Sequence, residues 1–456
     1  MKELCFRSAT TLARMIRQRQ VSSEEVVKAH LDRIDEVNPK LNAVVQIVRD
    51  RAVAEARAAD AGLARGELKG PLHGVPITVK DCLDTAGVIT TAGTSGRASH
   101  IPERDATVVA RLRSAGAILV GKTNLPELCM APTTNNAVYG RTNNPYDLER
   151  TPGGSSGGEA AIVAAGGSPL GIGTDIYGSI RLPSHCCGVA GIKPTSGRVP
   201  RTGDILASKV GAKDAWAQVG PIARAVEDLI LVLPIISGVD WKDPGITPMP
   251  LEDPAQVDLK HIRVAFFTDN GVATPTPETI DTVRKAAGAL MDVVRAVRED
   301  QPELPDVEKD WRMPGDTAWQ RRLLEECGWG ETDSWLKEYV QKNPDQSSAR
   351  EYVYRLNKLN SFRSSMLSFL QAYDIVLSPV WDRPAALHGE GRATGIYYTV
   401  QYNKVGWPAA VVRCGTSPEG LPIGVQIAGR PWCEHVVLSV AQYLELAFGG
   451  WQQPPL

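Results

Sequence analysis

The chain has 456 residues, of which 43% are hydrophobic, and it carries 50 Lys and Arg residues against 52 Asp and Glu residues. This length permits a large buried core, and the near-neutral charge, with no basic run longer than a pair, argues against a nucleic-acid partner. The sequence has no apolar window of about 18 residues and no signal-peptide core near its start, so we expect a cytoplasmic protein without a membrane partner.

The chain opens with two predicted helices, over residues 9–36 and 45–65. Runs rich in β-branched residues then predict strands, at residues 76–81, 116–123, 188–195, 261–269, 374–380, 409–416 and 422–429. Further helices are predicted between and after them, at residues 104–116, 159–167, 276–297 and 434–449. Alternation of strands and helices predicts an α/β fold, with a central mixed, twisted sheet that helices cover on both faces.

We expect one domain over residues 1–456. Its parts are N-terminal helices (1–69), a catalytic core (70–240) and a C-terminal return to the core (370–456). The stretch 298–348 differs because it is charged and rich in tryptophan, namely Trp311, Trp319, Trp329 and Trp335. It predicts an insertion or lid-like element that packs on the core or lines a substrate groove.

Cysteine and histidine give little sign of a metal site. The eight cysteines are scattered and no CxxC pair occurs, which favours reduced, mostly buried thiols. His185 precedes Cys186 and Cys187, but adjacent residues are poorly spaced to share one metal ion. We therefore expect no metal and no organic cofactor.

The run GAILVGKT, residues 116–123, matches the phosphate-binding pattern G-x-x-x-x-G-K-[ST]. That chemistry needs a flexible loop that follows a strand and opens a helix. Here the intervening residues Ala-Ile-Leu-Val read as a strand and the preceding segment reads as a helix. The order is inverted, so a nucleotide site is not expected.

The run GSSGG, residues 154–158, matches the nucleophile elbow G-x-S-x-G with Ser156 at its centre. Such an elbow follows a strand and needs a later acid and histidine, for which Asp382 and His435 are candidates. The preceding residues NNPYDLERTPGG read as a loop, which argues against this arrangement.

A third pattern combines Lys80, at the end of PITVK, with Ser155 in TPGGSSGGEAA and Ser179 in TDIYGSIRLP. A serine hydroxyl becomes a good nucleophile when a base takes its proton. A buried lysine can be that base when desolvation favours its neutral form, and Ser155 can relay the proton. The glycine loop that opens a helix adds N–H groups for developing negative charge.

These segments, with GVAGIKPTSGRVP after them, resemble the amidase signature family, which includes fatty acid amide hydrolases and glutamyl-tRNA amidotransferase A subunits. The resemblance is dense over residues 70–200 and continues at GPIARAVEDL, DIVLSPV and GWPAAVVRCGTSPEGLPIGVQIAG. It implies the amidase signature fold and a Ser–cis-Ser–Lys triad, with Ser179 as nucleophile, Ser155 as bridging serine and Lys80 as base.

The resemblance also implies roles for the residues around the triad. The oxyanion hole would be built by the backbone N–H groups of Ile176, Tyr177, Gly178 and Ser179. Hydrogen-bond partners that brace the site would be Ser156, Thr174, Asp175 and Arg181. Pocket-lining positions would be Met130 and Ala131, and the ring of Tyr177 makes it a further candidate for the pocket.

Tyr177 departs from the family pattern, which reads D-x-G-G-S where this chain reads Asp175-Ile176-Tyr177-Gly178-Ser179. A tyrosine at a position with positive φ would be strained by about 1–2 kcal/mol. At an ordinary φ its ring could instead be a pocket wall that favours flat or aromatic substrates. A tolerated substitution without a selective role is the alternative.

The predicted function is hydrolysis of small-molecule amides, with carbamates (urethanes) and esters as further candidates, by a monomer or homodimer. The alternative is an amidotransferase A-type subunit that releases ammonia from glutamine and works with partner subunits. An inactive binding scaffold is a third option, which the presence of all three triad residues disfavours.

Overall fold

The computed structural model describes residues 2–304, 316–328, 335–344, 348–390 and 393–456. Within them, one mixed sheet of 11 strands runs through the molecule in the order β1-β3-β2-β6-β8-β7-β12-β13-β11-β9-β10. The α/β fold with a large mixed sheet is therefore confirmed.

The seven predicted strands are all present: β2 (Pro76–Lys80), β3 (Ile118–Thr123), β7 (Ala190–Lys193), β9 (Arg263–Phe266), β11 (Ile375–Pro379), β12 (Ala409–Thr416) and β13 (Pro422–Gly429). The other sheet strands are β1 (Val44–Ile47), β6 (Leu170–Asp175), β8 (Gln218–Ala223) and β10 (Ala296–Glu299). A separate hairpin pairs β4 (Asn135–Asn136) with β5 (Gly140–Arg141).

Strands β6 and β8 escape a search for β-branched runs because glycine and proline interrupt them. Their glycines have a packing reason. A Cβ on Gly171 would lie 1.8 Å from the Glu159 carboxylate, and one on Gly220 would lie 2.2 Å from the Ile192 carbonyl. Close approach of neighbouring chain therefore selects glycine inside these central strands.

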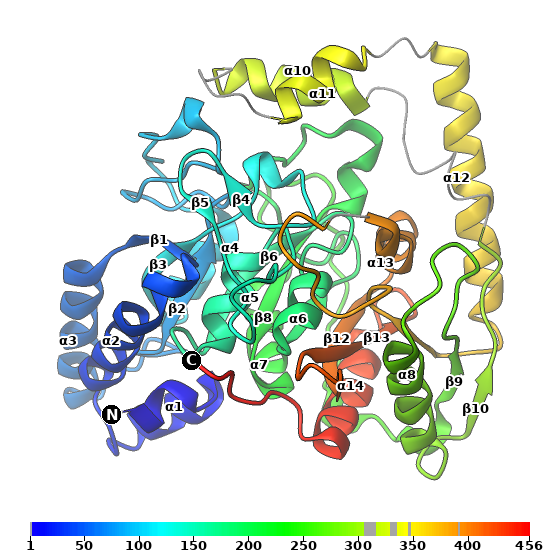
Figure 1. The fold of residues 1–456 in the computed structure, drawn as a ribbon. Helices are drawn as coiled ribbons and strands as arrows, with labels where there is room; N and C mark the ends of the chain where they lie inside the picture. Colours follow the sequence, from blue (N-terminus) through cyan, green and yellow to red (C-terminus); the bar gives the residue numbers. More distant parts are fainter. Residues whose placement is uncertain (1, 305–315, 329–334, 345–347, 391–392) are drawn as a thin grey trace.

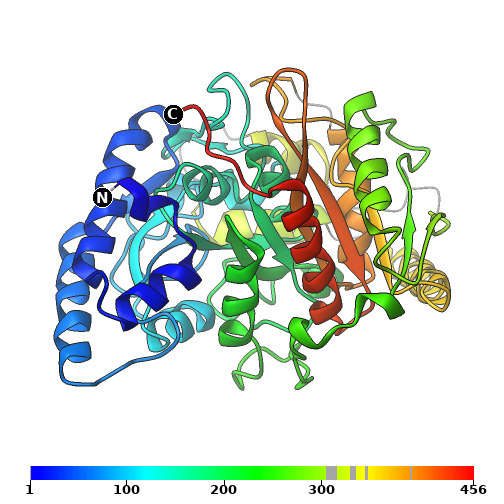
Figure 2. The same ribbon diagram turned by 90° about the horizontal axis from the view of Figure 1, so that it is seen from below.

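Helices cover both faces of the sheet, and the core consists of two apolar clusters. One face carries α1 (Ala9–Arg17), α4 (Thr107–Ser114), α7 (Val226–Ile236), α8 (Pro277–Leu290) and α14 (Glu434–Phe448). The other carries α2 (Ser23–Leu41), α3 (Arg49–Ala64), α5 (Gly157–Ala164) and α6 (Arg181–Cys187). In Figures 1 and 2, α14 (red) packs beside β12 and β13.

The predicted helix 9–36 is wrong as a single helix. It divides into α1 and α2, because α1 ends at Arg17 and Arg19 adopts a positive φ of 56°. A capping box restarts the chain as a helix: the Ser22 hydroxyl accepts from the Glu25 N–H, and the Glu25 carboxylate accepts from the Ser22 N–H. The serine-glutamate spacing of SSEE was the available signal.

Two other predicted helices were too long at one end. Residues 44–47 form β1, which pairs antiparallel with β3, before α3 begins at Arg49. Residues 296–299 form β10, parallel to β9, after α8 ends at Leu290. In both cases tertiary pairing with a neighbouring strand takes a segment whose composition also suits a helix.

The remaining described α-helices lie toward the C-terminal half: α10 (Asp316–Glu326), α11 (Trp335–Lys342), α12 (Ala349–Phe369) and α13 (Ile396–Lys404). Of the stretch 298–348, the described helices are α10 and α11, which Figure 1 shows side by side at the top of the view. Trp311 and Trp329 lie outside the described residues. No described helix combines the length and the apolar character needed to span a bilayer.

Candidate active site

Lys80 is the last residue of β2 and is fully buried. Its Nζ donates to Ser155 Oγ at 2.6 Å and to Thr174 Oγ1 at 2.8 Å. Strand β2 runs parallel to β6, so the carboxyl ends of both strands meet at one edge of the sheet. That topology brings Lys80 and Thr174 together although 94 positions separate them.

Ser155 lies in the glycine loop before α5, and the Gly154–Ser155 peptide bond is cis. The loop fits tightly against the segment after β3, since a Cβ on Gly154 would lie 2.5 Å from the Thr133 carbonyl oxygen. The Ser156 N–H donates to the Ser179 carbonyl oxygen at 3.2 Å. This backbone bond ties the loop of Ser155 to the loop of Ser179.

Ser179 lies between β6 and α6 and is 8% exposed. The left-handed conformation in this turn belongs to Gly178, with φ of 113°, and Tyr177 has no positive φ. A Cβ on Gly178 would also lie 2.5 Å from Thr399 Oγ1, so glycine is required there on two grounds. The structure thus removes the strain alternative for Tyr177.

Asp175 and Arg181 brace the turn that carries Ser179. Arg181 Nε and Nη2 donate to the two Asp175 carboxylate oxygens at 3.0 and 2.9 Å, and both side chains are buried. Burial alone would raise the pKa of Asp175, but Arg181 and the Asn403 amide hold it well below its usual range. Arg181 also donates to Gln426 Oε1 at 2.7 Å. Its guanidinium group therefore joins Asp175 at the end of β6 to Gln426 in β13.

The four expected oxyanion-hole donors are not equivalent. The Gly178 N–H donates to Asp175 Oδ1 at 2.8 Å, which reduces what it can offer a substrate oxygen. Within the described residues, the N–H groups of Ile176 and Ser179 donate to no protein acceptor. Because they are not used within the protein, these two N–H groups are the ones best able to donate to a ligand oxygen.

Tyr177 is a half-buried side chain with specific partners. Its hydroxyl accepts from Lys213 Nζ at 2.5 Å, and its ring meets the Trp216 ring edge-on with centroids 6.3 Å apart. Lys213 Nζ lies 5.2 Å from the Tyr177 ring centroid and 5.5 Å from that of Trp216. The tyrosine therefore belongs to an aromatic and cationic cluster beside the Ser179 turn.

Met130 and Ala131 follow the short helical turn η3 (Glu127–Cys129). Met130 Sδ accepts from Gln320 Nε2 of α10 at 3.9 Å. Pro132, two positions after Met130, presses on the loop of Ser155: a Cβ on Gly154 would lie 2.7 Å from the Pro132 carbonyl carbon. The two predicted pocket residues therefore belong to the segment that lies against the glycine loop.

A buried carboxyl group lies beneath the site. Glu159 of α5 accepts hydrogen bonds from the hydroxyls of Thr78 in β2 and Thr123 in β3, the latter at 2.8 Å. Its complete burial raises its pKa to about 7, and the hydrogen bonds from Thr78 and Thr123 offset this only in part. The group ties the helix that follows Ser155 to the strand that carries Lys80.

The candidates for an elbow triad and for a metal site have other partners. His435 Nε2 lies 3.0 Å from a Glu252 carboxylate oxygen, and Asp382 accepts from the Thr394 hydroxyl at 3.1 Å. His185 is buried, with one ring nitrogen 3.0 Å from the Arg383 carbonyl oxygen and the other accepting from the Gly424 N–H. Among the described residues, no three His, Cys, Asp or Glu side chains form a metal-binding group.

Sequence reasoning missed Lys213, Thr399, Asn403 and Gln426. The Thr399 hydroxyl donates to the Tyr177 carbonyl oxygen at 2.6 Å, and Asn403 Nδ2 donates to Asp175 Oδ1 at 2.9 Å. Both residues lie on α13, four positions apart, and so share one helix face. That spacing was visible, but only the fold shows which partner the face meets.

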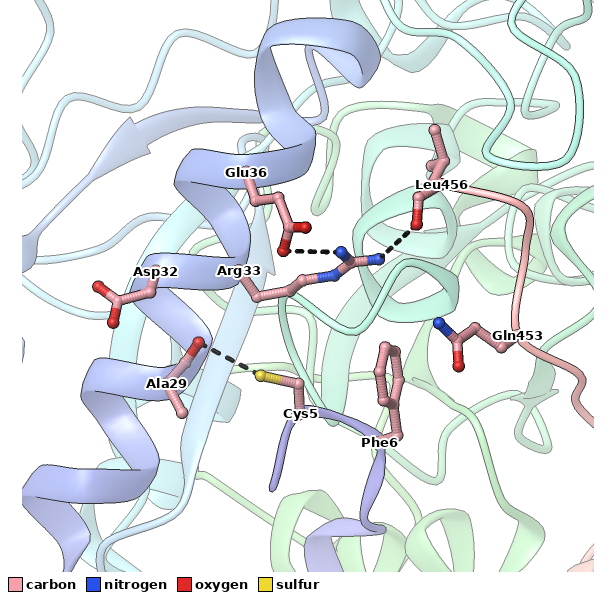
Figure 3. A pocket seen from close by; sticks show the side chains of 8 residues that line it. All are labelled: Cys5, Phe6, Ala29, Asp32, Arg33, Glu36, Gln453 and Leu456. Atoms are coloured by element: carbon pink, nitrogen blue, oxygen red, sulfur yellow. Dashed lines mark hydrogen bonds and ion pairs between the residues drawn. The ribbon is translucent and has the colours of Figure 1, made fainter. Parts of the chain in front are cut away.

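A separate cavity of about 280 Å³ lies between α2, the N-terminal residues and the C-terminal tail (Figure 3). Arg33 crosses it: its guanidinium pairs with Glu36 at 2.9 Å and donates to the Leu456 carbonyl oxygen at 3.5 Å. The same guanidinium lies 5.5 Å from the Phe6 ring centroid. These contacts hold the two ends of the chain together, on the side where Figures 1 and 2 place both termini.

Comparison with known proteins identifies the family of the chain. The family model described as Amidase matches residues 25–322 and 325–438. The A subunit of glutamyl-tRNA(Gln) amidotransferase from Anaeromyxobacter dehalogenans (strain 2CP-C) is 34% identical, over 100% of this chain and 99% of its own length. The acylamidase of Rhodococcus erythropolis is also 34% identical, over 97% of this chain and 96% of its own.

Solved structures show the same fold. The structure of 6-aminohexanoate cyclic dimer hydrolase is similar with a TM-score of 0.90 and 30% identity, covering 99% of both chains. A bacterial aryl acylamidase is similar with a TM-score of 0.86 and 26% identity, over 97% of this chain and 96% of its own. The fold and the site together define the class of the protein as an amidohydrolase. More narrowly, the chain belongs to the amidase signature family.

Proposed function

We propose that this amidohydrolase is a stand-alone hydrolase of small-molecule amides that works through an acyl-enzyme on Ser179. The observation that carries the proposal is the contact of Lys80 Nζ with Ser155 Oγ at 2.6 Å, in a loop tied by a backbone hydrogen bond to Ser179. The names of an acylamidase and an aryl acylamidase among its relatives support the same bond type.

In the proposed reaction, Ser179 Oγ attacks the carbonyl carbon of the substrate. Its proton passes to Ser155 Oγ while the Ser155 proton passes to the Lys80 amine, so the relay gains one proton at Lys80. Backbone N–H groups of Ile176 and Ser179, with that of Tyr177, stabilise the developing oxyanion, while Gly178 and Asp175 hold the turn.

Collapse of the tetrahedral intermediate breaks the C–N bond. The proton on Lys80 returns through Ser155 to the departing nitrogen, which leaves as an amine, and Ser179 remains acylated. Water then attacks the acyl-enzyme with the same proton relay and releases the carboxylic acid. Every step uses protein groups and water alone.

Carbamates and esters are further candidate substrates because the same attack applies to their carbonyl carbon. A carbamate acyl-enzyme would be a carbamoyl or carbonate ester of Ser179, according to which bond breaks. We expect esters to react through the same nucleophile, since an alkoxide is a better leaving group than an unprotonated amide nitrogen and depends less on proton delivery through Ser155.

Purified protein mixed with a chromogenic anilide, an ester and an aryl carbamate tests the proposal. We expect release of aniline or phenol that is abolished in Ser179→Ala and retained in the matched control Ser364→Ala, on the exposed face of α12. Equal release by parent and Ser179→Ala would contradict the proposed nucleophile.

The second candidate is an amidotransferase A-type subunit, favoured by full-length matches to the A subunits of glutamyl-tRNA(Gln) amidotransferases. This function requires glutamine and partner subunits. Silence of the purified protein on all three chromogenic substrates, together with release of ammonia from glutamine only after partner subunits are added, would establish it in place of the stand-alone hydrolase.

A further inference from the structure

Helix α10 is fastened over the segment that borders the site. Lys209 Nζ lies 3.1 Å from a Glu326 carboxylate oxygen near the end of the helix. Just beyond it, the backbone of Cys327 approaches Gly96 so closely that a Cβ there would lie 1.8 Å from the Cys327 carbonyl oxygen. Leu323 is also buried, so α10 is packed on the body of the protein.

The preceding turn of α10 reaches the predicted substrate pocket. Gln320 contacts Met130, and Met130 belongs to the segment whose residues Pro132 and Thr133 press on Gly154. Gln320 therefore contacts the segment that packs against the loop of Ser155. The amide of Gln320 does not belong to the catalytic relay.

Gln320 and its neighbour Trp319 carry polar atoms with no protein partner. Gln320 Oε1 and Trp319 Nε1 are both shielded from solvent, and neither has a hydrogen-bond partner among the described residues. A shielded polar atom without a partner is energetically costly, so folded proteins rarely retain one without a reason. Here one acceptor and one donor stand on adjacent residues of α10, and Gln320 also contacts Met130.

We propose that Gln320, together with Trp319, is a specificity determinant that recognises a second amide group on the substrate, beyond the bond that is cleaved. A secondary amide supplies an N–H for Gln320 Oε1 and a carbonyl oxygen for Trp319 Nε1, which matches the two unpartnered atoms. The inference rests on the proposed amide hydrolysis and extends it to substrates with two amide or carbamate groups.

Two pairs of substrates, matched in chain length, test this recognition. On the acyl side, N-acetylglycine 4-nitroanilide is compared with pentanoyl 4-nitroanilide, which lacks the second amide. On the leaving-group side, 4-acetamidoacetanilide is compared with 4-propylacetanilide. We expect Gln320→Leu to lower the kcat/KM ratio of diamide to monoamide about 5- to 10-fold in one pair, the loss of one hydrogen bond.

Gln341→Leu, the same substitution at an exposed position of α11, is the matched control and should leave both ratios unchanged. An unchanged ratio in both pairs for Gln320→Leu would overturn the inference. An equal fall of kcat/KM for both members of each pair would also overturn it, because it would indicate a structural role of α10.

Binding separates this inference from the proposed reaction. Calorimetry on Ser179→Ala measures the Kd of each uncleaved substrate, with and without Gln320→Leu. Preference for the diamide that is lost in the double variant supports the inference even if the parent cleaves none of the four substrates. Equal Kd values within both pairs in Ser179→Ala would overturn it independently of catalysis.

Discussion

The hydroxyl of Tyr177 accepts a 2.5 Å hydrogen bond from Lys213, 36 positions further along the chain. The contact places a cation against the residue at which this chain departs from its family pattern. Since Tyr177 has no positive φ, and its ring packs edge-on against Trp216, the tyrosine is accommodated by tertiary contacts rather than by backbone strain.

Replacing Tyr177 by phenylalanine keeps the ring and removes the hydrogen bond. We expect a loss of about 1–3 kcal/mol in the free energy of unfolding, because the buried Lys213 ammonium loses a partner. Urea denaturation measures it. Tyr443→Phe, whose hydroxyl donates to a backbone carbonyl at 3.1 Å, is a control for a neutral hydrogen bond and should cost less.

Replacing Tyr177 by glycine removes the ring and restores the family pattern. If the ring is a pocket wall, we expect the ratio of kcat/KM for aryl amides to that for alkyl amides to change about tenfold, with the preference for flat acyl groups reduced. Initial rates on a benzoyl and a hexanoyl anilide measure it. Equal ratios in parent and variant would show that the ring has no selective role.

The buried Asp175–Arg181 pair should tolerate little change. Arg181→Lys keeps the charge but cannot form two parallel hydrogen bonds to Asp175 while also reaching Gln426. We expect a loss of about 3 kcal/mol or more in stability and nearly complete loss of activity, since the turn of Ser179 loses its brace. Denaturation curves and amide hydrolysis rates measure both effects.

The exposed Arg65–Glu67 pair provides the comparison for that substitution. Its side chains are 61% and 62% exposed, although their contact is as short as 2.7 Å. Arg65→Lys should therefore change stability by less than about 0.5 kcal/mol. If Arg181→Lys and Arg65→Lys lost comparable stability, the conclusion that burial makes the Asp175–Arg181 pair important would be contradicted.

Thr174 is the second partner of the Lys80 amine. Thr174→Val preserves shape and removes the hydroxyl at 2.8 Å from Nζ, so we expect kcat to fall about tenfold or more as Lys80 loses orientation. Thr174→Ser retains the hydroxyl and should recover most of the rate. Failure of serine to recover activity would assign the effect to packing instead.

Glu159 should make stability depend on pH. Burial raises its pKa to about 7 from an ordinary 4.5, so the folded state holds a proton in this interval that the unfolded state has released. This group therefore stabilises the fold less as pH rises from about 4.5 to 7. Relative to Glu159→Gln, the parent should lose about 3 kcal/mol of stability across that window.

Denaturation of parent and Glu159→Gln in a series of buffers measures that difference. Glu325→Gln, at an exposed position of α10, reports what a glutamate-to-glutamine change does by itself. A difference between parent and Glu159→Gln that stays constant from acid to neutral pH would contradict the role of burial.

Local sequence was sufficient to predict all seven β-branched strands and the fold class, because a strand buried on both faces needs a short, continuous apolar run. It was insufficient for β6 and β8. Their glycines are required by neighbouring residues that come close only in the folded chain, such as Glu159 beside Gly171. Likewise β1 is drawn into the sheet by pairing with β3.

The residues of the site divide in the same way. Lys80, Ser155 and Ser179 could be proposed as the reacting groups from the sequence, because their dense family motifs lie within about one hundred residues of one another. The partners Lys213, Thr399 and Asn403 come from segments without a chemical motif, and only the tertiary structure brings them to Tyr177 and Asp175. Sequence by itself determined which groups could react, since reactivity belongs to residue type. The fold decided which side chains hold them in place, because distance between remote segments is a property of packing.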